Sequence, residues 1–538
     1  MERFKVVFWA LCMGVSGLSV AQTSNRYMVF FTDKDATPYS IESPDEFLSQ
    51  RSIDRRERHN IGISAEDLPV DPAYVSALND VADVYFTTRW FNGALVQTLS
   101  TNLPIIEALS FVSRVELVAL GAVLTREQQP MPTPPPAVEA DTTGFSTDFQ
   151  NELIGGDEMH ADGFRGEGIL VAVMDGGFRR VHEFEVFRHL FDENRLVATR
   201  DFVTDSYDPF QFSGHGTAVL SCIAGYRSEH IKGLAHNADI ALFVTEEVST
   251  EYRVEEYNWL FAAEMADSMG VDVINTSLGY TDFDLASMNY SYSAMDGQTA
   301  VTSRAAEIAF SKGMFLVTSN GNLGNSSWQY MSAPADAPNS LAVGALTSNL
   351  LKTTFSSIGP TFDSRIKPDV ATLGSDVTVF SGSSFSFSNG TSFASPLVAG
   401  LVAGLWQQHP EWTNTQLLRA IRLSSSRAGD PNFEMGYGIP NYRLEENETV
   451  LAFKESPSDI IAYPNPVTSN VLTLDFRGTD FQLISGHLIN THGQVLQVFD
   501  AGSNNPTVEV DLSPVSDGLY YLKLVGDNDT HLFKVIKR

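Results

Sequence analysis

The apolar positions between residues 148 and 444 form two alternating patterns, short continuous runs and longer segments that end at a glycine. Ile169–Met174 is apolar at every position, as expected for a strand buried on both faces of a parallel sheet. Val254–Met269 has the length of a helix and is followed by Gly270, a residue common after helix ends. The same alternation predicts helices at Thr217–Ala224 and Ser303–Lys312, and strands at Ile240–Val244, Val273–Leu278, Met314–Thr318 and Leu341–Ala345. This order predicts an α/β fold, a doubly wound parallel sheet with helices on both faces.

Residues 22–120 show a shorter pattern of mixed helices and strands. Four arginines within Arg51–Arg58 are interleaved with Asp54 and Glu57, so we interpret that helix face as solvated rather than as a nucleic-acid contact. A Pro-rich stretch within 121–147 then predicts an extended linker. The pattern predicts a small α+β domain, with strands at Tyr27–Phe31, Val84–Thr88, Ala94–Leu99 and Val115–Leu120 and helices at Ser43–His59, Asp71–Val81 and Asn102–Phe111.

After residue 444 the pattern changes again, to short strand-like runs separated by Gly, Asn and Asp turns. Regular short strands of this kind predict a small β-sandwich. We place a linker at 445–462 and the sandwich at 463–538. The predicted strands are Val471–Phe476, Gln482–Asn490, Val495–Val498, Thr507–Asp511, Leu519–Val525 and His531–Ile536.

The first 21 residues have the pattern of a cleaved secretory signal. Arg3 and Lys5 precede the apolar run Val6–Leu18, and Ser19–Ala21 offers small residues for cleavage. A membrane anchor needs about 20 apolar residues, and this run is shorter. We expect no transmembrane segment in the mature chain.

Composition limits the possible partners and the redox chemistry. A formal net charge of −31 argues against nucleic acid or an anionic membrane as a partner. The length of 538 residues implies several domains. Of the two cysteines, Cys12 and Cys222, the first lies in the predicted signal, so the mature chain has no internal disulfide. We interpret Cys222 as a small buried side chain rather than a regulatory thiol.

Four polar residues stand at predicted strand ends or helix starts of the large domain. Asp175 follows the run Ile169–Met174, and His215 lies between two glycines at a helix start. Asn322 follows a central strand, and Ser392 opens an apolar helix within Asn-Gly-Thr-Ser-Phe-Ala-Ser-Pro. Alone, each also fits a structural role as a turn cap, a turn residue or a helix start.

Together these residue types suit nucleophilic catalysis. A serine hydroxyl needs an adjacent base to take its proton, and histidine fits because its pKa lies near neutrality. A carboxylate holds the histidine in one tautomer and stabilises its charged form. A side-chain amide and a backbone N–H at a helix N-terminus can bind the developing oxyanion.

The order Asp175, His215, Asn322, Ser392 resembles that of the subtilisin-like serine peptidases. The resemblance covers Asp148 to Leu444 and implies peptide hydrolysis through an acyl-enzyme, without a cofactor for the chemistry. It implies Ser392 as nucleophile, His215 as base, Asp175 as its orienting carboxylate and Asn322 as oxyanion donor. Protein or peptide substrates are then the expected ligands.

The sequence departs from the usual pattern of this family in two places, and the resemblance also predicts a substrate preference. Gly176 stands where the family usually has Ser or Thr, which removes one support of the aspartate, and we expect a modest effect. The insertion Tyr280–Thr302 is expected to border the cleft. The resemblance assigns the walls of the P1 pocket to two segments without charge, which favours a broad, apolar-leaning preference there. The six residues are Ser277, Leu278, Gly279, Ser319, Asn320 and Gly321.

Structural calcium is common in this family. Asp201, Asp205 and Asp208 could supply oxygen ligands, but a solvated loop is the favoured interpretation. The sequence offers no Cys/His cluster suited to zinc.

The flanking domains also carry resemblances. Trp90–Gln97 and Val115–Val118 resemble the inhibitory prodomains of this family, with removal expected within Gly121–Phe145, an exposed linker. Tyr463–Pro466 and Gly518–Leu522 resemble the C-terminal sorting domain of the Bacteroidota type IX secretion pathway. This implies the secretion machinery as a partner and export through the periplasm, followed by release or attachment to the cell surface. An accessory sandwich that binds carbohydrate or protein is the alternative.

Two hypotheses remain for the whole chain. The first is a secreted serine endopeptidase made as a precursor. The second is a surface binding or adhesion protein on a peptidase scaffold with weak or no activity, because a fold alone does not establish catalysis.

Overall fold

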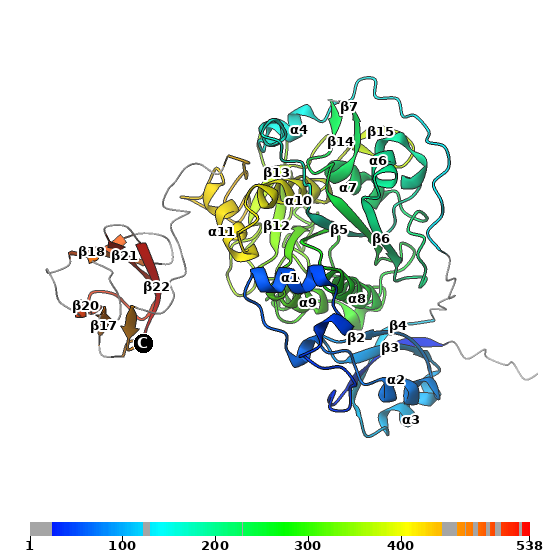
Figure 1. The fold of residues 1–538 in the computed structure, drawn as a ribbon, viewed down its shortest axis with the longest axis horizontal. Coiled ribbons are helices and arrows are strands. Elements are labelled where there is room, and N and C mark those ends of the chain that lie inside the picture. The colour runs from blue at the N-terminus through cyan, green and yellow to red at the C-terminus, as the bar shows by residue number, and fades with distance from the viewer. Residues whose placement is uncertain are drawn as a thin grey trace, which may run out of the picture.

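A computed structural model describes residues 24–121, 130–228, 230–443, 460–468, 470–476, 483–490, 495–500, 507–526 and 530–538. The predicted signal, 1–21, and most of the predicted linker 445–462 lie outside these residues. Figure 1 shows a large central domain with a smaller module at each end of the chain.

A seven-stranded parallel sheet forms the centre of the large domain, in the order β13-β12-β11-β10-β5-β9-β6. The neighbouring interior strands β10, β5 and β9 are buried at nearly every position, as the continuous apolar runs of β5 and β9 predict. The bounds are β5 Leu170–Asp175, β6 Leu196–Asp201, β9 Asp239–Val244, β10 Val273–Thr276, β11 Phe315–Ser319, β12 Leu341–Leu346 and β13 Val370–Leu373.

Helices cover both faces of this sheet, as predicted (Figure 1). On one face α7 packs against β5, and α10 runs over β10 to β13. On the other face α8 and α9 pack against each other and against β5 and β11. The helix bounds are α7 His215–Ala224, α8 Val254–Met269, α9 Val301–Ser311 and α10 Thr391–Gln408. Gly270 ends α8 in the left-handed region, at φ 84°, which glycine adopts without strain.

The remaining α-helices and hairpins of the large domain are short, apart from the 11-residue helix α11. The sequence pattern predicted alternating helices and strands in this domain but did not place these elements individually. They are the helices α4 Asp148–Glu152, α5 Gly156–Ala161, α6 Arg188–Asp192 and α11 Asn414–Ser424, and the hairpins β7 Tyr226–Ser228 with β8 Ile231–Lys232 and β14 Val377–Phe380 with β15 Phe385–Ser388.

The amino-terminal module is an α+β domain with a four-stranded antiparallel sheet in the order β2-β3-β1-β4. Its helix α1 begins at Gln50 rather than at Ser43, because the Ser49 hydroxyl caps the helix by accepting from the Ser52 N–H. The bounds are β1 Asn25–Phe31, α1 Gln50–Arg58, α2 Pro72–Asn79, β2 Asp83–Thr88, β3 Gly93–Thr98, α3 Leu103–Glu107 and β4 Val112–Ala119.

The interpretation of a solvated arginine face on α1 was wrong for Arg55 and Arg56, although Arg58, Asp54 and Glu57 are exposed as expected. Arg55 and Arg56 are fully buried against α8 of the large domain. Their guanidinium nitrogens lie 2.6 Å and 2.8 Å from Oδ1 of Asp267, and Arg89 lies 2.6 Å from its Oδ2. These three cations lower the pKa of the buried Asp267 to about 2, although burial by itself would raise it.

A second carboxylate of α8, Glu264, binds the turn that joins β2 to β3. It accepts hydrogen bonds from the backbone N–H groups of Arg89 and Trp90, at 2.9 Å and 3.2 Å, and from the Thr88 hydroxyl. The amino-terminal module is therefore joined to the large domain by buried charges as well as by apolar contacts.

The carboxyl-terminal module contains two antiparallel sheets, β16-β17-β20 and β19-β18-β21-β22, around an apolar core of its own. The six predicted strands match six of the seven observed, to within two residues at each end. Their bounds are β16 Ile461–Tyr463, β17 Val471–Asp475, β18 Leu483–Asn490, β19 Val495–Asp500, β20 Thr507–Asp511, β21 Gly518–Gly526 and β22 Thr530–Lys537.

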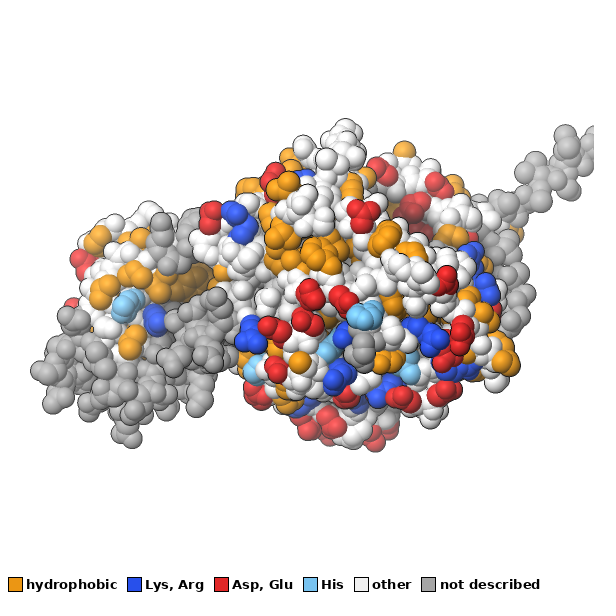
Figure 2. All heavy atoms as spheres, turned by 90° about the horizontal axis from the view of Figure 1, so that it is seen from above, with side chains coloured by type: hydrophobic (Ala, Val, Ile, Leu, Met, Phe, Trp, Pro, Cys, Tyr) orange, Lys and Arg blue, Asp and Glu red, His pale blue; other side chains and the backbone are white. Residues whose placement is uncertain are grey.

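Among the described residues, no helix combines the length and the apolar character that a membrane span requires. Over the face of the molecule seen in Figure 2, acidic and basic side chains are intermixed.

Candidate active site

The strand order of the large sheet creates a crevice at the carboxyl end of β5. After β5 the chain builds β6 and β9 on one side of it, and then β10 to β13 on the other. Open α/β sheets bind ligands where the strand order reverses in this way. Asp175 ends β5, and Ser277 follows the neighbouring strand β10.

Asp175 and His215 form a direct pair at this crevice. Nδ1 of His215, the first residue of α7, lies 2.9 Å and 3.0 Å from the two carboxylate oxygens of the fully buried Asp175. The Gly176 N–H donates to the same carboxylate at 2.8 Å, which provides a backbone donor at the position without a hydroxyl. Gly216 allows this approach, because a Cβ there would lie 2.9 Å from Cβ of Asp175 and 2.5 Å from the Gly177 carbonyl oxygen.

The pKa of His215 is raised above its ordinary value. The charge of Asp175 is the main cause, and burial opposes it. An imidazole whose charged form is stabilised in this way can take a proton from a hydroxyl and hold it.

Ser392 is the second residue of α10, after Gly390 at φ 153°. Its hydroxyl donates to the Ser277 carbonyl oxygen at 3.2 Å, and the Ser277 hydroxyl donates to the Ser392 carbonyl oxygen at 2.8 Å. The next side chain, Phe393, lies against His215 with 5.6 Å between ring centroids. The first turn of α10 therefore lies beside the imidazole, and in this state the serine hydroxyl bonds the β10 side of the crevice.

Asn322 is an exposed residue after β11 that faces the same helix start. Its Oδ1 accepts from the Thr391 N–H at 2.9 Å and from the Thr391 hydroxyl at 3.0 Å, which leaves the amide Nδ2 for another ligand. The position of a Cβ on Gly390 would lie 3.7 Å from this Nδ2 and 3.6 Å from the Ser392 nitrogen. Two N–H donors therefore border one small space, which the missing side chain of Gly390 keeps open.

The two segments predicted to bind substrate lie side by side but do not contribute equally. Ser319 donates to the Leu278 carbonyl oxygen at 3.4 Å and so connects them. Ser277, Leu278 and Gly279 line a cleft of about 560 Å³ that includes Asp175 and His215. Ser319, Asn320 and Gly321 are not among the described residues that line it, and the amide of Asn320 points inward to the Ser357 carbonyl oxygen at 2.7 Å.

Sequence reasoning missed the acidic side of this cleft. Glu246, Glu247 and Glu251 follow β9 and line it, together with Asp284 from the insertion 280–302. The Tyr280 hydroxyl donates to Glu246 Oε1 at 2.5 Å, which fastens the insertion to the loop after β9. The position of Glu246 directly after a predicted buried strand was the signal that could have indicated it.

A family model described as the subtilase family, Peptidase S8, matches residues 166–439, about half of the chain. The chain belongs to the subtilase family. Two further models match its flanking modules: a Peptidase S8 propeptide domain of Bacteroidota at residues 26–132, and a secretion system C-terminal sorting domain at residues 461–538. The protein is a subtilisin-like serine peptidase with a propeptide and a type IX sorting domain, and so a secreted or cell-surface protein.

Several relatives are similar to this subtilase. Subtilisin NAT of Bacillus subtilis subsp. natto is 30% identical over 288 residues, which cover 53% of this chain and 67% of that protein. Subtilisin of Bacillus pumilus is 30% identical over 287 residues, 53% of this chain and 92% of that protein. Among solved structures, MycP1 with the N-terminal propeptide removed is 21% identical, with a TM-score of 0.42, over 57% of this chain and 98% of that one.

The predicted calcium candidates of this subtilase are engaged in their own loop. The Asp201 carboxylate accepts from the Val203 N–H at 2.8 Å and from the Thr204 N–H at 3.0 Å, and Asp205 forms an ion pair with Arg200. Asp201 and Asp205 are buried, so the expectation of a solvated loop was wrong for them. The three aspartates do not converge within the described residues. The acidic group that does converge is Glu246, Glu251 and Glu255.

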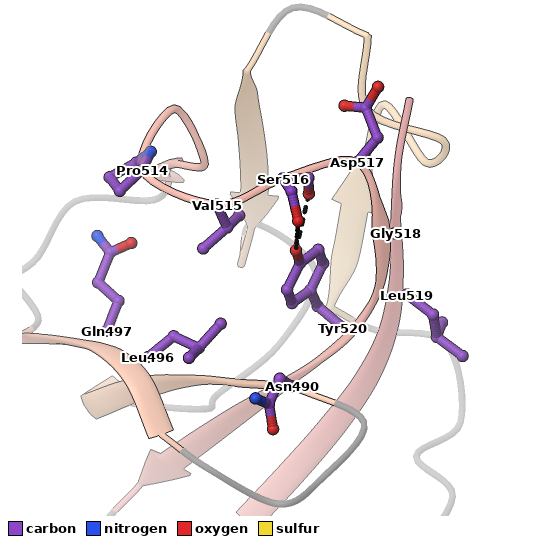
Figure 3. A pocket seen from close by; sticks show the side chains of 10 residues that line it. All are labelled: Asn490, Leu496, Gln497, Pro514, Val515, Ser516, Asp517, Gly518, Leu519 and Tyr520. Atoms are coloured by element: carbon purple, nitrogen blue, oxygen red, sulfur yellow. Dashed lines mark hydrogen bonds between the residues drawn. The ribbon is translucent and has the colours of Figure 1, made fainter.

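Two other features of the subtilase lie away from this chemistry. Cys222 is a free, buried thiol, and burial raises its pKa to about 12, in keeping with the interpretation of a small core side chain. A cavity of about 570 Å³ in the carboxyl-terminal module is lined by Asn490, Leu496, Gln497 and residues 514–520 (Figure 3). Its Tyr520 hydroxyl donates to the Ser516 carbonyl oxygen at 2.7 Å, and the described residues that line the cavity include no histidine or cysteine.

Proposed function

We propose that the mature protein is a secreted endopeptidase that works through an acyl-enzyme on Ser392. His215 takes the serine proton while Ser392 Oγ attacks the carbonyl carbon of the peptide bond, and Asp175 holds the imidazole and stabilises its charge. The C–N bond then breaks, and His215 gives its proton to the leaving amine. A water molecule, deprotonated by His215, finally hydrolyses the acyl-enzyme and regenerates Ser392. The observation that carries the proposal is the Asp175–His215 pair, at 2.9 Å, beside the first turn of α10.

The oxyanion of the tetrahedral intermediate would bind in the space next to Gly390. Asn322 Nδ2 and the Ser392 N–H would donate to it, and the N-terminus of α10 adds a favourable field. The Ser392 hydroxyl has to turn from the Ser277 carbonyl oxygen toward His215 when substrate binds, and catalytic hydrogen bonds often form only in the substrate complex. Ser277, Leu278 and Gly279 would bind the substrate near P1, with Ser319, Asn320 and Gly321 supporting the opposite wall through their backbone.

The flanking modules would control when and where this site acts. The signal at 1–21 and the sorting module would direct the precursor through the periplasm to the secretion machinery. The module at 22–120 would keep the precursor silent until the linker 121–147 is cut. Residues 148–444 would then act on protein or peptide substrates, with calcium as a possible structural ion outside the chemistry.

A fluorophosphonate probe tests this function directly. Processed wild-type protein should be labelled on Ser392 and should cleave an unfolded protein substrate. If the processed protein is neither labelled nor active, the alternative of a binding or adhesion protein on a peptidase scaffold is supported instead.

Replacing Asn322 with alanine should lower kcat by a factor of about 10²–10³ with little change in KM, because its amide would bind charge that exists only in the transition state. That magnitude is the one known for the oxyanion asparagine of subtilisin itself. Steady-state kinetics on a peptide substrate measures it. Asn325→Ala, an exposed asparagine of the same loop, is the matched control and should leave kcat unchanged. A wild-type kcat in Asn322→Ala would remove Asn322 from the proposal.

Acid should weaken the contact between the amino-terminal module and the peptidase domain through His59. This side chain lies against Trp406, with 5.8 Å between ring centroids, and burial lowers its pKa from 6.5 to about 4. The separated module takes up a proton below pH 6.5 that the complex excludes, so affinity falls as the pH drops from 6.5 toward 4. Asp267, with its pKa of about 2, contributes only below about pH 4.

We expect about 30-fold weaker binding at pH 5 than at pH 7.5. Calorimetry of the separately produced module with a peptidase domain carrying Ser392→Ala measures it without proteolysis. His59→Gln should remove most of the pH dependence. An equal dependence in this variant would assign the effect to another group.

Deleting Tyr463–Arg538 should leave active enzyme in the periplasm. The carboxyl-terminal module has its own apolar core, separate from that of the peptidase domain, so its loss leaves the active-site scaffold intact. Fractionation of cells followed by fluorophosphonate labelling measures both location and activity. Normal export of the shortened chain would contradict the sorting role.

A further inference from the structure

The cleft beside the proposed active site has an unbalanced charge. Four carboxylates besides Asp175 line it, those of Glu246, Glu247, Glu251 and Asp284. Among the described residues that line it there is no lysine or arginine. A cleft lined by one sign of charge attracts ligands of the other sign.

Three carboxylates converge at the base of this acidic side. One oxygen each from Glu246, Glu251 and Glu255 lies within 4.8 Å of the other two. Glu255, in the first turn of α8, is 1% exposed, and outside these three carboxylates its Oε2 has no hydrogen-bond partner among the described residues. Its Oε1 accepts from the Glu247 N–H at 3.1 Å. An unpartnered buried carboxylate oxygen is costly unless a cation or a donor completes it.

Burial and mutual repulsion disfavour three ionised carboxylates here unless a positively charged ligand binds them. Burial raises the pKa of Glu255 to about 11, of Glu246 to about 8 and of Glu251 to about 7. Repulsion between neighbouring carboxylates adds to this, including that of Glu246 on Glu255. A bound cation would remove both penalties.

In the precursor an arginine of the amino-terminal module lies near this group. Arg26 of β1 is buried, which lowers its pKa, and the carboxylates of Glu247 and Glu255 oppose that shift. Arg26 leaves with the module when the precursor is processed. In the precursor a guanidinium therefore lies close enough to the acidic side of the cleft to feel the charge of Glu247 and Glu255.

We propose that Glu246, Glu251 and Glu255 form a subsite for a lysine or arginine side chain of the substrate, on the acyl side of the bond that is cleaved. This inference rests on the proposed function, because it requires the cleft beside His215 to bind the substrate chain. Glu246 and Glu251 would bind the ligand from the cleft wall. The buried Glu255 lies behind them, with one oxygen within 4.8 Å of one oxygen of each, and would add its negative charge. Arginine is the better fit, because its planar fork binds carboxylates in pairs.

The acyl side follows from the position of the cleft. The acidic group shares the cleft with Ser277, Leu278 and Gly279, the proposed wall of the P1 pocket. The P1 wall itself is uncharged, so the basic side chain belongs to a neighbouring position, between P2 and P4. The processing segment of the precursor contains one such residue, Arg126, which is the only lysine or arginine between Arg114 and Arg165.

Matched fluorogenic peptides test the subsite. Each pair differs only in arginine against glutamine at one position from P1 to P4, and kcat/KM is measured for the processed enzyme. We expect arginine to be preferred about tenfold to a hundredfold at one position among P2 to P4, as a charge-assisted hydrogen bond allows. The preference should decrease with added salt, because screening weakens charge interactions in an open cleft.

Glu251→Gln should reduce that preference about tenfold, mainly through a lower kcat/KM on the arginine peptide, and an undiminished preference would overturn the subsite. Glu411→Gln, an exposed glutamate outside the cleft, is the matched control and should keep the full preference. Glu251 is chosen over Glu255 because it lines the open cleft and is not part of the core.

The outcomes separate this inference from the proposed function. Cleavage of all peptides with no arginine preference at P2 to P4 would overturn the subsite and leave the peptidase function standing. Loss of all cleavage and of fluorophosphonate labelling would overturn both. A calcium-dependent rise in Tm that Glu251→Gln abolishes, without any arginine preference, would assign the three carboxylates to a metal ion and overturn the subsite.

Discussion

Replacing Ser392 with alanine is expected to abolish peptide hydrolysis, with a fall in kcat on the order of 10⁶-fold. That is the loss known for the nucleophile of subtilisin itself, and it leaves only the small rate that the oxyanion donors and substrate binding provide. The substitution removes one oxygen atom, and among the described residues that atom forms one hydrogen bond, to the Ser277 carbonyl oxygen. Folding should therefore be retained, and the full-length precursor should accumulate because self-processing stops.

Steady-state kinetics and gel analysis of the precursor measure this result. Ser383→Ala, an exposed serine of the hairpin that precedes α10, is the matched control and should process and cleave normally. Residual turnover close to wild type, or fluorophosphonate labelling in Ser392→Ala, would assign the nucleophile to another residue.

The second large effect is expected at Asp267, far from the chemistry. Asp267→Asn leaves Arg55, Arg56 and Arg89 without the buried charge that they share. Breaking a buried ion pair by removing one partner costs about 3–5 kcal/mol. The dissociation constant of the amino-terminal module should therefore rise by about 10²–10³-fold, because each 1.4 kcal/mol is tenfold.

Inhibition of the processed enzyme by the separately produced module measures this change. The enzyme's own kcat should be unaffected, because Asp267 lies on the side of the sheet opposite α7 and α10. Asp430→Asn removes an exposed ion pair with Arg427 and should change the inhibition constant little. Equal inhibition of wild type and Asp267→Asn would mean that apolar contacts alone hold the module.

The elements that sequence predicted best are those buried on both sides. The strands β5 and β9 carry continuous apolar runs, and β10 and β11 begin with Val-Ile and Phe-Leu-Val, so their pattern depends little on what packs around them. The places of the four polar residues of the candidate site could also be predicted, because each lies at or just after the end of a buried strand or in the first turn of a buried helix. Their catalytic roles stay predictions. Edge strands such as β6, with the sequence Leu-Val-Ala-Thr-Arg-Asp, carry weaker patterns and were missed.

What sequence could not predict depends on contacts between distant segments. Arg55 and Arg56 look like a solvated helix face until α8 supplies Asp267, more than 200 residues away. The acidic cleft likewise joins the loop after β9, the first turn of α8 and the insertion that contains Asp284. Local periodicity carries no information about which distant charges will meet.

Asp267, the carboxylate on α8 that three arginines share, also limits which substitutions this sequence can accept during evolution. Asp267 belongs to the part of the chain proposed to persist, whereas its three arginines belong to a part proposed to be discarded. A substitution there can be harmless to the finished enzyme and still prevent the enzyme from being made. If the module is discarded, Asp267 would be under selection for a contact that the processed enzyme no longer makes. An amino-terminal module exchanged between relatives would need the arginines that pair with this aspartate.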